Sequence, residues 1–268
     1  MSIIQSIILG IIQGITELLP ISSSAHLFLI PWIFRWDSSA QFNIEFEAFD
    51  VALHAGTLLA IGIFFFKDWI NLIKSGFNQI TKKTNTKEGK MFWYIVIATI
   101  PGGLIGLVLD KFVEGYLKQP LIIGIALSIM GILLYIVDKK AKSKTNYEDM
   151  NFKQTFLIGL SQSLAFIPGV SRSGVTMTVG RMLGVKREAA ARYSFMLSAP
   201  IVLAATIYKF KDFNFNLSFI IGIITSFIVG IIVIKFLLEY LKKGSFKIFA
   251  IYRVIIGIIV IVLALTRI

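Results

Sequence analysis

The sequence predicts an all-α polytopic membrane protein with two inverted repeats, each made of one re-entrant helix hairpin and three transmembrane helices. Of its 268 residues, 56% are hydrophobic and only 16% are charged, whereas a soluble domain has about 25% charged residues. The apolar residues form several runs as long as a transmembrane helix. The same order of broken and unbroken runs occurs twice, over about residues 1–138 and 153–268, within a single integral membrane domain spanning residues 1–268.

The composition also limits the classes of partner and site. The formal net charge is +12, but most Lys and Arg residues lie in a few segments between apolar runs. That pattern is typical of membrane orientation, so no nucleic-acid partner is expected. The chain has no cysteine, which excludes disulfides and thiolate metal ligands. No basic residue precedes Arg35, so the positive region of a signal peptide is missing and we expect the N-terminus to be retained.

The first repeat opens on a broken apolar segment. Residues 3–18 and 24–34 are apolar, but Pro20 and three serines separate them, and neither half approaches the roughly 20 residues that a span requires. Together they predict a re-entrant hairpin, whose irregular backbone must be buried in protein or line a wet cavity. The rest of the repeat is predicted as an acidic loop, a span, a basic loop and two further spans, at 37–47, 48–66, 67–90, 91–109 and 120–138.

The second repeat has the same layout. After a basic loop at 139–152, a segment at 153–184 breaks at Pro168 and Gly169. Three spans follow, at about 188–208, 217–238 and 248–266. Because each repeat contains an odd number of spans, the second repeat is expected to be inverted relative to the first. Such repeats place a site at their interface, near the middle of the membrane.

The basic residues orient this arrangement. Sixteen Lys and Arg residues lie in one set of loops and six in the other set; the first set is 67–90, 139–153, 184–187 and 242–247, and the second is 35–47, 110–119, 209–216 and 267. The positive-inside rule puts the first set in the cytoplasm. The first hairpin then enters from outside and the second from the cytoplasm, so that their tips can meet.

The first break contains polar residues that an apolar chain does not need for packing. Gln13 and Glu17 are four residues apart and share a helix face, and a carboxylate within a membrane segment is a functional candidate. A buried Glu satisfied by a Ser or Arg neighbour is the structural alternative. Ser23 stands three residues before His26, so a hydroxyl nucleophile and an imidazole base could be neighbours. The serines precede a half-helix, where they can cap it or help to bind an anion such as phosphate.

The second break is more specific. In the stretch PGVSRSG, Arg172 lies between Ser171 and Ser173, with Gly169 and Gly174 outside them. Glycines let the backbone approach a ligand closely, and a guanidinium matches phosphate oxygens. A structural ion pair between Arg172 and the carboxylate of the first break is the alternative.

Other polar residues in the spans give weaker indications. Asp50 and His54 are four residues apart on one face, and they are either groups that support a site or ordinary residues near an interface. Arg192 and Arg253 are expected to be structural or to reach toward the membrane surface. A carboxylate beside a phosphate suits Mg²⁺ or Ca²⁺, and no His-rich motif has the spacing of a zinc site.

The two broken segments resemble the signature regions of the undecaprenyl-diphosphate phosphatase family, membrane enzymes linked to bacitracin resistance. The first family motif is a Glu/Gln-x-x-x-Glu pair followed by Pro-x-Ser-Ser and a His, matched here by Gln13, Glu17, Pro20, Ser22, Ser23 and His26. The second is Pro-Gly-x-Ser-Arg-Ser-x-x-Thr, matched by Pro168, Gly169, Ser171, Arg172, Ser173 and Thr176. The resemblance runs over nearly the whole chain, including FDVALHAGTLLA and the final FAIYR.

The resemblance implies hydrolysis of undecaprenyl diphosphate to the monophosphate at the outer face of the bacterial plasma membrane, which recycles the lipid carrier for cell-wall synthesis. It assigns Ser23 as the candidate nucleophile, His26 as the acid/base and Arg172 as the diphosphate clamp. Glu17 would hold a divalent cation, Mg²⁺ or Ca²⁺, or position the reacting group. The other motif residues are expected to contact the substrate: Gln13, Ser22, Ser24, Gly169, Ser171, Ser173 and Thr176.

Two features of the implied chemistry stay open. Many family members carry Glu where this chain has Gln13, so Glu17 is the only carboxylate of that pair. The reaction can proceed through a phosphoserine or through an activated water.

The expected partners are the polyprenyl diphosphate and membrane lipids, and a homodimer stays open.

Two other classes of function are compatible with the sequence. Inverted repeats with broken helices are also a transporter design, so a polyprenyl-phosphate flippase is the main alternative. Lipid translocation in proteoliposomes without phosphate release would favour it. A purely structural membrane protein is the third class, and Glu17 and Arg172 at membrane depth argue against it.

The predicted orientation can be tested by labelling. A single cysteine or a tag introduced within residues 139–152 should be shielded from membrane-impermeant reagents added outside, because these basic residues are predicted to be cytoplasmic. Labelling from outside would show that the orientation is reversed and that the site faces the cytoplasm.

Overall fold

The computed structural model describes residues 1–36, 40–112 and 116–266, with side chains throughout except at 40–45, 107 and 109–112. Within these ranges the regular structure is helical, apart from one isolated backbone bridge between Thr145 and Val185. Six helices in the described ranges are long and apolar enough to cross a membrane. The chain is therefore an all-α polytopic membrane protein, which confirms the predicted fold class.

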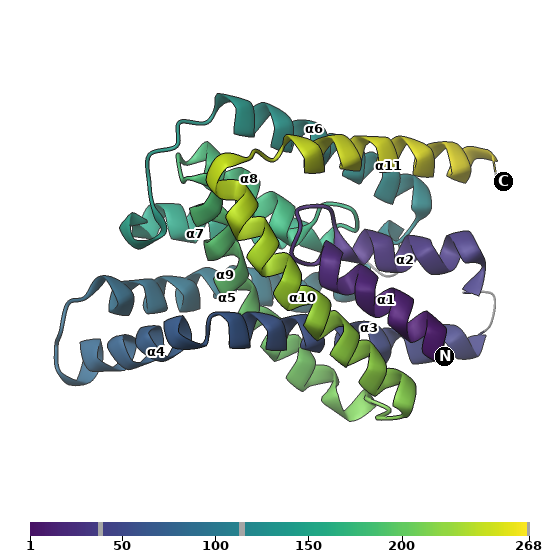
Figure 1. Ribbon diagram of the computed structural model, residues 1–268, viewed down its shortest axis with the longest axis horizontal. Helices are drawn as coiled ribbons and strands as arrows, with labels where there is room; N and C mark the ends of the chain where they lie inside the picture. Colours follow the sequence, from purple (N-terminus) through teal and green to yellow (C-terminus); the bar gives the residue numbers. More distant parts are fainter. Residues whose placement is uncertain (37–39, 113–115, 267–268) are drawn as a thin grey trace.

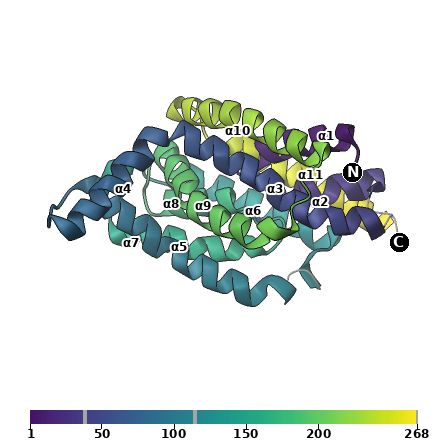
Figure 2. The same ribbon diagram turned by 90° about the horizontal axis from the view of Figure 1, so that it is seen from below.

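The long helices form a bundle in which the two halves of the chain are interleaved. They are α3 (Ala40–Phe64), α5 (Lys87–Phe112), α6 (Pro120–Lys140), α9 (Arg187–Lys209), α10 (Leu217–Lys243) and α11 (Lys247–Thr266). Helices α6 and α11 lie side by side along the upper edge of Figure 1, and α10 packs against α3. The N-terminus and the end of α11 lie at the same end of the molecule, opposite the loop at residues 82–86 (Figures 1 and 2).

Two pairs of short helices complete the bundle. The first pair is α1 (Ile3–Thr16) and α2 (Ser23–Phe34); the second is α7 (Phe152–Ser161) and α8 (Arg172–Met182), with the 3-10 turn η4 (Gln162–Phe166) between them. Both pairs begin with a capping box, Ser2 with Gln5 and Asn151 with Gln154, which satisfies N–H groups at the helix start. Each pair precedes three spans, the predicted order of elements, while the inversion of one repeat stays a prediction.

Two predicted loops are wrong over most of their described length. Residues 40–47 of the predicted loop 37–47 belong to α3, so the first span begins earlier than expected. The segment 67–90 forms helix α4 (Phe66–Thr81), and only residues 82–86 connect it to α5. Gly76 of α4 lies against the ring of Phe92, and the indole Nε1 of Trp93 donates a hydrogen bond to the Gly76 carbonyl at 3.2 Å. The lysines of this segment indicated a loop, but its apolar residues recur at helical spacing and α4 packs on α5. Two further predicted loops contain single 3-10 turns, η3 (Tyr147–Asp149) and η5 (Phe210–Asp212).

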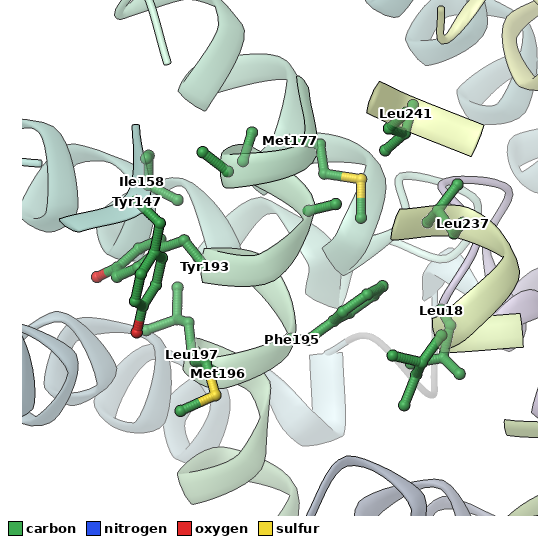
Figure 3. Packing of buried hydrophobic residues seen from close by; sticks show 14 of the residues in the cluster. Leu18, Tyr147, Ile158, Met177, Tyr193, Phe195, Met196, Leu197, Leu237 and Leu241 are labelled. Carbon is green, nitrogen blue, oxygen red and sulfur yellow. The ribbon is translucent and has the colours of Figure 1, made fainter. Parts of the chain in front are cut away.

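The largest buried apolar cluster joins both halves of the chain around α9. Figure 3 shows Met177 of α8, Phe195 of α9 and Leu237 of α10 gathered in one region, with Leu18 of the first break beside them. All four side chains are at most 2% exposed. The start of α9 contributes small side chains, Ala189 to Ala191, which let neighbouring helices approach closely. The first break therefore rests on the same core that holds the second hairpin.

A buried polar network fixes one end of this core. Asp138, near the end of α6, accepts hydrogen bonds from the Nε atoms of Arg181 and Arg187, both at 2.8 Å. It also accepts one from the backbone N–H of Phe246 at 3.1 Å. Because one carboxylate receives donors from α8, α9 and the turn before α11, these elements are held in register with α6. The network positions α8, whose other end begins at the second break.

Candidate active site

The two helix breaks meet in the interior of the protein. The Ser173 Oγ donates a hydrogen bond to the Leu19 carbonyl at 3.0 Å. The guanidinium of Arg172 forms an ion pair with the carboxylate of Glu17. Both contacts cross from one hairpin to the other. The structure thus brings together the two segments that the sequence analysis selected.

A buried arginine, Arg253 of α11, ties the breaks to each other. Its guanidinium donates to the carbonyl of Pro20 at 3.1 Å in the first break, and to those of Gly169 and Val170 at 2.8 and 2.9 Å in the second. Its Nε donates to the Leu127 carbonyl of α6 at 3.4 Å. Irregular backbone at membrane depth needs such donors, because water cannot supply them. A structural role for Arg253 is thus confirmed, and its side chain, 0% exposed, does not reach toward the membrane surface.

The two breaks end in the same local geometry. Ser22 and Ser171 are the N-caps of α2 and α8, with φ angles of 79° and 72°. Non-glycine residues rarely adopt this left-handed region, and such residues cluster at functional sites. Each serine Oγ accepts a hydrogen bond from the backbone N–H three residues later. Ser23 and Arg172 follow as the first residues of the two helices, so they occupy equivalent positions at two helix N-termini, where an anion is favoured.

Glu17 is the centre of the polar contacts between the breaks. Its Oε1 pairs with Arg172. Its Oε2 accepts hydrogen bonds from the Ser23 Oγ at 2.5 Å and the Gln13 Nε2 at 3.3 Å, and it lies 3.2 Å from the Nε2 of His54. The carboxylate is thus fixed in one orientation by neighbours on both oxygens.

A cavity of about 280 Å³ lies beside this cluster. Its polar lining residues are Glu17, Ser23, Ser24, Asp50, His54, Gln162, Ser171 and Arg172. Its apolar lining residues are Val51, Ala165, Phe166, Ile201, Val202 and Ala205. A cavity with both kinds of lining suits an amphiphilic ligand with an anionic head.

The two histidines of the chain are placed differently. The predicted acid/base, His26, is buried behind the cavity wall: its Nδ1 lies 2.7 Å from the Ser22 carbonyl and its Nε2 lies 2.8 Å from the Tyr252 hydroxyl. The two rings are stacked, with centroids 5.7 Å apart. Both nitrogens of His26 are therefore engaged by protein groups, and its role in proton transfer stays a prediction. His54 lies in the cavity wall itself.

The other predicted contact residues divide into two groups. Ser24 and Ser171 line the cavity. The rest support it through contacts with Glu17, Arg253 or neighbouring backbone and hydroxyl groups, as seen for Gln13, Ser22, Gly169, Ser173 and Thr176. Their contact with a ligand stays a prediction.

Sequence analysis did not select Gln162, although it lies in the cavity wall. Its Nε2 donates to the Ala98 carbonyl at 3.0 Å. The repeated Gly-x-x-Gln spacing places Gln13 and Gln162 at corresponding points of the two broken segments. That spacing is the signal that could have identified it. No comparable sequence pattern pointed to Tyr252. It is far from His26 in the sequence, and only the fold brings the two side chains into contact.

The side-chain oxygens of this site suit a divalent cation that a phosphate ligand binds at the same time. Among the described residues, no group of three acidic or histidine side chains forms a protein-only cage. Mg²⁺ usually binds through one or two carboxylates together with substrate phosphates. Glu17 and Asp50 both line the cavity. The buried Oε1 of Gln13 has no hydrogen-bond partner in the described part of the chain. Carboxylate and amide oxygens are the kind of donor that Mg²⁺ and Ca²⁺ prefer.

The fold and the cavity define a polytopic membrane protein with a partly polar cavity where two broken helices meet. A family model described as "Bacitracin resistance protein BacA" matches residues 6–259. The chain therefore belongs to the BacA family.

Curated relatives cover the chain almost end to end. A relative named undecaprenyl-diphosphatase from Pelotomaculum thermopropionicum is 49% identical, over 100% of this chain and 98% of its own length. Proteins of the same name from Desulforudis audaxviator and Moorella thermoacetica are 45% and 42% identical, over 98% and 97% of both chains respectively. The similarity thus includes both broken segments and all six spans.

The role of Arg253 can be tested by replacement with lysine. Lysine keeps the charge but cannot reach carbonyl groups in both breaks from one ammonium. Loss of a charged hydrogen bond costs about 1.5–3 kcal/mol, so local opening of the breaks should become roughly 10- to 100-fold more frequent. Hydrogen exchange measured by mass spectrometry should be faster around residues 17–24 and 167–174 in Arg253→Lys.

Arg192→Lys is the matched control, because the Arg192 guanidinium pairs with the partly exposed Asp68 at 2.9 Å, away from the breaks. Exchange in the two breaks should be unchanged in this variant. Equal exchange in wild type and Arg253→Lys would show that Arg253 does not hold the breaks.

Proposed function

We propose that the protein hydrolyses undecaprenyl diphosphate to the monophosphate and inorganic phosphate, the activity named for its relatives. The observation that carries this proposal is the contact of Glu17 with both Arg172 and Ser23 at two helix N-termini inside a membrane cavity. A guanidinium binds phosphate oxygens, and a hydroxyl paired with a carboxylate can be activated for attack. The groups needed for a reaction at phosphorus are therefore adjacent.

Substrate binding exchanges one ion pair for another. In the free protein Arg172 pairs with Glu17. A diphosphate carries more negative charge than a carboxylate and presents several oxygens, so it competes for the guanidinium. Once Arg172 contacts the phosphate, Glu17 loses a positive neighbour and becomes a better proton acceptor. Arg172 therefore acts as the clamp, and its movement prepares the carboxylate.

The reaction then proceeds at the terminal phosphorus. The Ser23 Oγ lies 2.5 Å from the Glu17 Oε2, within the distance for direct proton transfer. Glu17 takes the hydroxyl proton as Oγ bonds to phosphorus, and the bond from that phosphorus to the bridging oxygen breaks, releasing the lipid monophosphate. Water then cleaves the phosphoserine to inorganic phosphate and restores the hydroxyl. Direct attack by a water activated by Glu17 gives the same products without the phosphoserine.

His26 supports this chemistry from behind the cavity. Its Nδ1 lies 2.7 Å from the Ser22 carbonyl, and Ser22 immediately precedes the proposed nucleophile. A ring held between that carbonyl and Tyr252 keeps the start of α2 in place. We therefore assign His26 a positioning role, which leaves Glu17 as the proton acceptor.

The apolar lining fits the lipid part of the substrate. Phe166 of η4 and Ile201 and Val202 of α9 line the same cavity as the polar residues. An apolar chain that leaves the diphosphate along these side chains is removed from water at about 25 cal/mol per Å² buried. This lining supports a polyprenyl diphosphate over free pyrophosphate as the substrate.

A divalent cation, Mg²⁺ or Ca²⁺, completes the proposal. Glu17 and Asp50 would hold it together with the substrate phosphates, with the Gln13 amide oxygen as a further donor. When bound, it neutralises charge on the phosphate oxygens. The protein's own part is to orient these oxygen donors, since the contacts of Glu17 already fix its carboxylate.

The cavity is proposed to open at the outer face of the bacterial plasma membrane. Asp50 and His54 lie near the start of the α3 span, and Ile201 and Ala205 lie in the second half of α9. With the basic loops in the cytoplasm, these helix ends face outside. The chain acts as one membrane domain, and two inverted repeats would bring the two hairpins together at its centre. The proposed site draws all its residues from one chain, so it does not require a homodimer.

The clamp is tested by phosphate release from a polyprenyl diphosphate in detergent. Arg172→Ala should lower turnover by about 10²- to 10³-fold, the usual cost of losing one donor to developing charge. Arg172→Lys should lie between this variant and wild type, because the charge stays but the planar fork is lost. Lys211→Ala, which removes an exposed cation of η5, should match wild type.

Unchanged turnover in Arg172→Ala would remove the clamp from the proposal. Lipid translocation by the wild type in proteoliposomes, with no phosphate released, would instead support a flippase.

The cation is tested in the same assay. Removing divalent ions with a chelator should abolish turnover, and added Mg²⁺ or Ca²⁺ should restore it, because the carboxylates and phosphates otherwise repel each other. Glu17→Gln should not be restored by either ion. Full turnover of the chelated wild type would show that the phosphatase needs no cation.

A further inference from the structure

A second cavity lies between α6 and α11, the pair of long helices along the upper edge of Figure 1. Its volume is about 340 Å³, within the roughly 300–1,000 Å³ of small-ligand sites. All its lining residues belong to these two helices, and none of them lines the cavity at the helix breaks. The proposed reaction therefore leaves this groove unused.

The lining of the groove combines small and large apolar residues. Gly131 of α6 and Ala250 of α11 line it, and the helices are so close here that a Cβ on Gly131 would lie 2.9 Å from the Ala250 carbonyl oxygen. Ile132, Ile251 and Ile255 also line it, and their side chains are 46–52% exposed. Exposed isoleucines of transmembrane helices face lipid chains, which are equally apolar. The groove therefore suits an apolar chain.

One end of the groove carries two cations. Lys247 lines it directly. The ammonium of Lys139 lies 5.9 Å from the centre of the Tyr135 ring, which also lines it. The adjacent carboxylate, Asp138, pairs with arginines of the core, and neither lysine forms an ion pair in the described part of the chain. Both ammonium groups are thus available to an anion.

The cationic end coincides with the ends of two spans. Lys139 lies in the last turn of α6 and Lys247 is the first residue of α11, beside basic segments that are predicted to be cytoplasmic. From Lys247 to Ile255 the helix advances about 12 Å at 1.5 Å per residue. Tyr135 stands near the lysines, as aromatic residues do at a membrane–water interface. The lysines are therefore placed at the membrane surface and the isoleucines in its hydrocarbon.

We propose that this groove binds one anionic phospholipid, with its phosphate at Lys139 and Lys247 and an acyl chain along Ile251 and Ile255. Lysines near the membrane surface attract the anionic lipids of the cytoplasmic leaflet. Two ammonium groups offer point charges without the planar fork of arginine, which suits a phosphodiester with a single negative charge. The inference concerns a site separate from the proposed phosphatase site and does not depend on that activity.

A lipid in this position joins two helices that support the breaks. Its phosphate contacts α6 through Lys139 and α11 through Lys247. The groove also adjoins Arg253, because a Cβ on Gly131 would lie 3.0 Å from the Arg253 Cβ. Arg253 donates to carbonyls of both breaks. A ligand that binds only the folded protein stabilises it by mass action, so the lipid should raise the temperature of thermal unfolding.

The cationic end is tested with purified protein in detergent. The protein is titrated with phosphatidylglycerol, and separately with phosphatidylcholine of the same acyl chains, and bound lipid is followed by native mass spectrometry. Wild type should bind phosphatidylglycerol more tightly. Lys139→Gln/Lys247→Gln should bind it about 25-fold more weakly, at about fivefold per lysine. Lys74→Gln/Lys82→Gln, which removes two exposed lysines at α4, is the matched control and should bind as wild type does.

The apolar part is tested with a pair of isoleucine variants. Ile251→Ser should weaken the binding of phosphatidylglycerol about 3- to 10-fold, because a half-exposed isoleucine loses its contact with the acyl chain. Ile224→Ser is the control, since Ile224 of α10 is 49% exposed and does not line the groove. Thermal unfolding without added lipid should show that every variant is folded, and phosphatidylglycerol should stabilise only those that bind it.

Each outcome decides the inference without a measurement of phosphate release. Equal binding of the two phospholipids by wild type, or unchanged binding of phosphatidylglycerol by Lys139→Gln/Lys247→Gln, would overturn it. A polyprenyl monophosphate that displaces phosphatidylglycerol and binds more tightly would show that another lipid occupies the groove. A dimer in lipid-free detergent that Ile251→Ser dissociates would show that a second copy of the chain covers it.

Discussion

A helix break at membrane depth exposes backbone carbonyls that water cannot reach, and the arrangement of this protein depends on how those groups are satisfied. Arg253 donates to carbonyls of both breaks, at Pro20, Gly169 and Val170. Close packing leaves this side chain little freedom, because a Cβ on Gly174 would lie 2.5 Å from its Nη1. One guanidinium therefore sets the distance between the two hairpins, and α2 and α8 begin at a common cavity as a result.

The polar lining of that cavity places charges of opposite sign next to each other. Arg172 pairs with Glu17, which lies beside His54, which in turn lies beside Asp50. Isolated charges at this depth would be costly, and the guanidinium of Arg172 and the carboxylate of Glu17 compensate each other.

Most of the fold could be predicted because the length and composition of the apolar segments identify the transmembrane helices. Pro20 and Pro168 mark the two helix breaks. The meeting of Glu17 with Arg172 also followed from the predicted arrangement of two opposed hairpins. The position of His54 did not, because its spacing from Asp50 gives a shared face but not the rotation of α3. That rotation is set by packing such as Gly56 against Ser226 of α10, which no local pattern encodes. The partners of Arg253 were equally hidden, since they are backbone atoms from separate segments.

Ser23 and Arg172 occupy equivalent positions in two locally similar loops, and this has a consequence for how such a site can arise. A symmetric pair of identical half-length chains would carry the same residue at both tips, either two hydroxyls or two guanidiniums. Neither pair combines a hydroxyl with a fixed cation. Joining the halves in one polypeptide lets the two positions accept different substitutions. A hydroxyl at one tip and a guanidinium at the other is therefore an arrangement that a symmetric pair of identical half-chains cannot have.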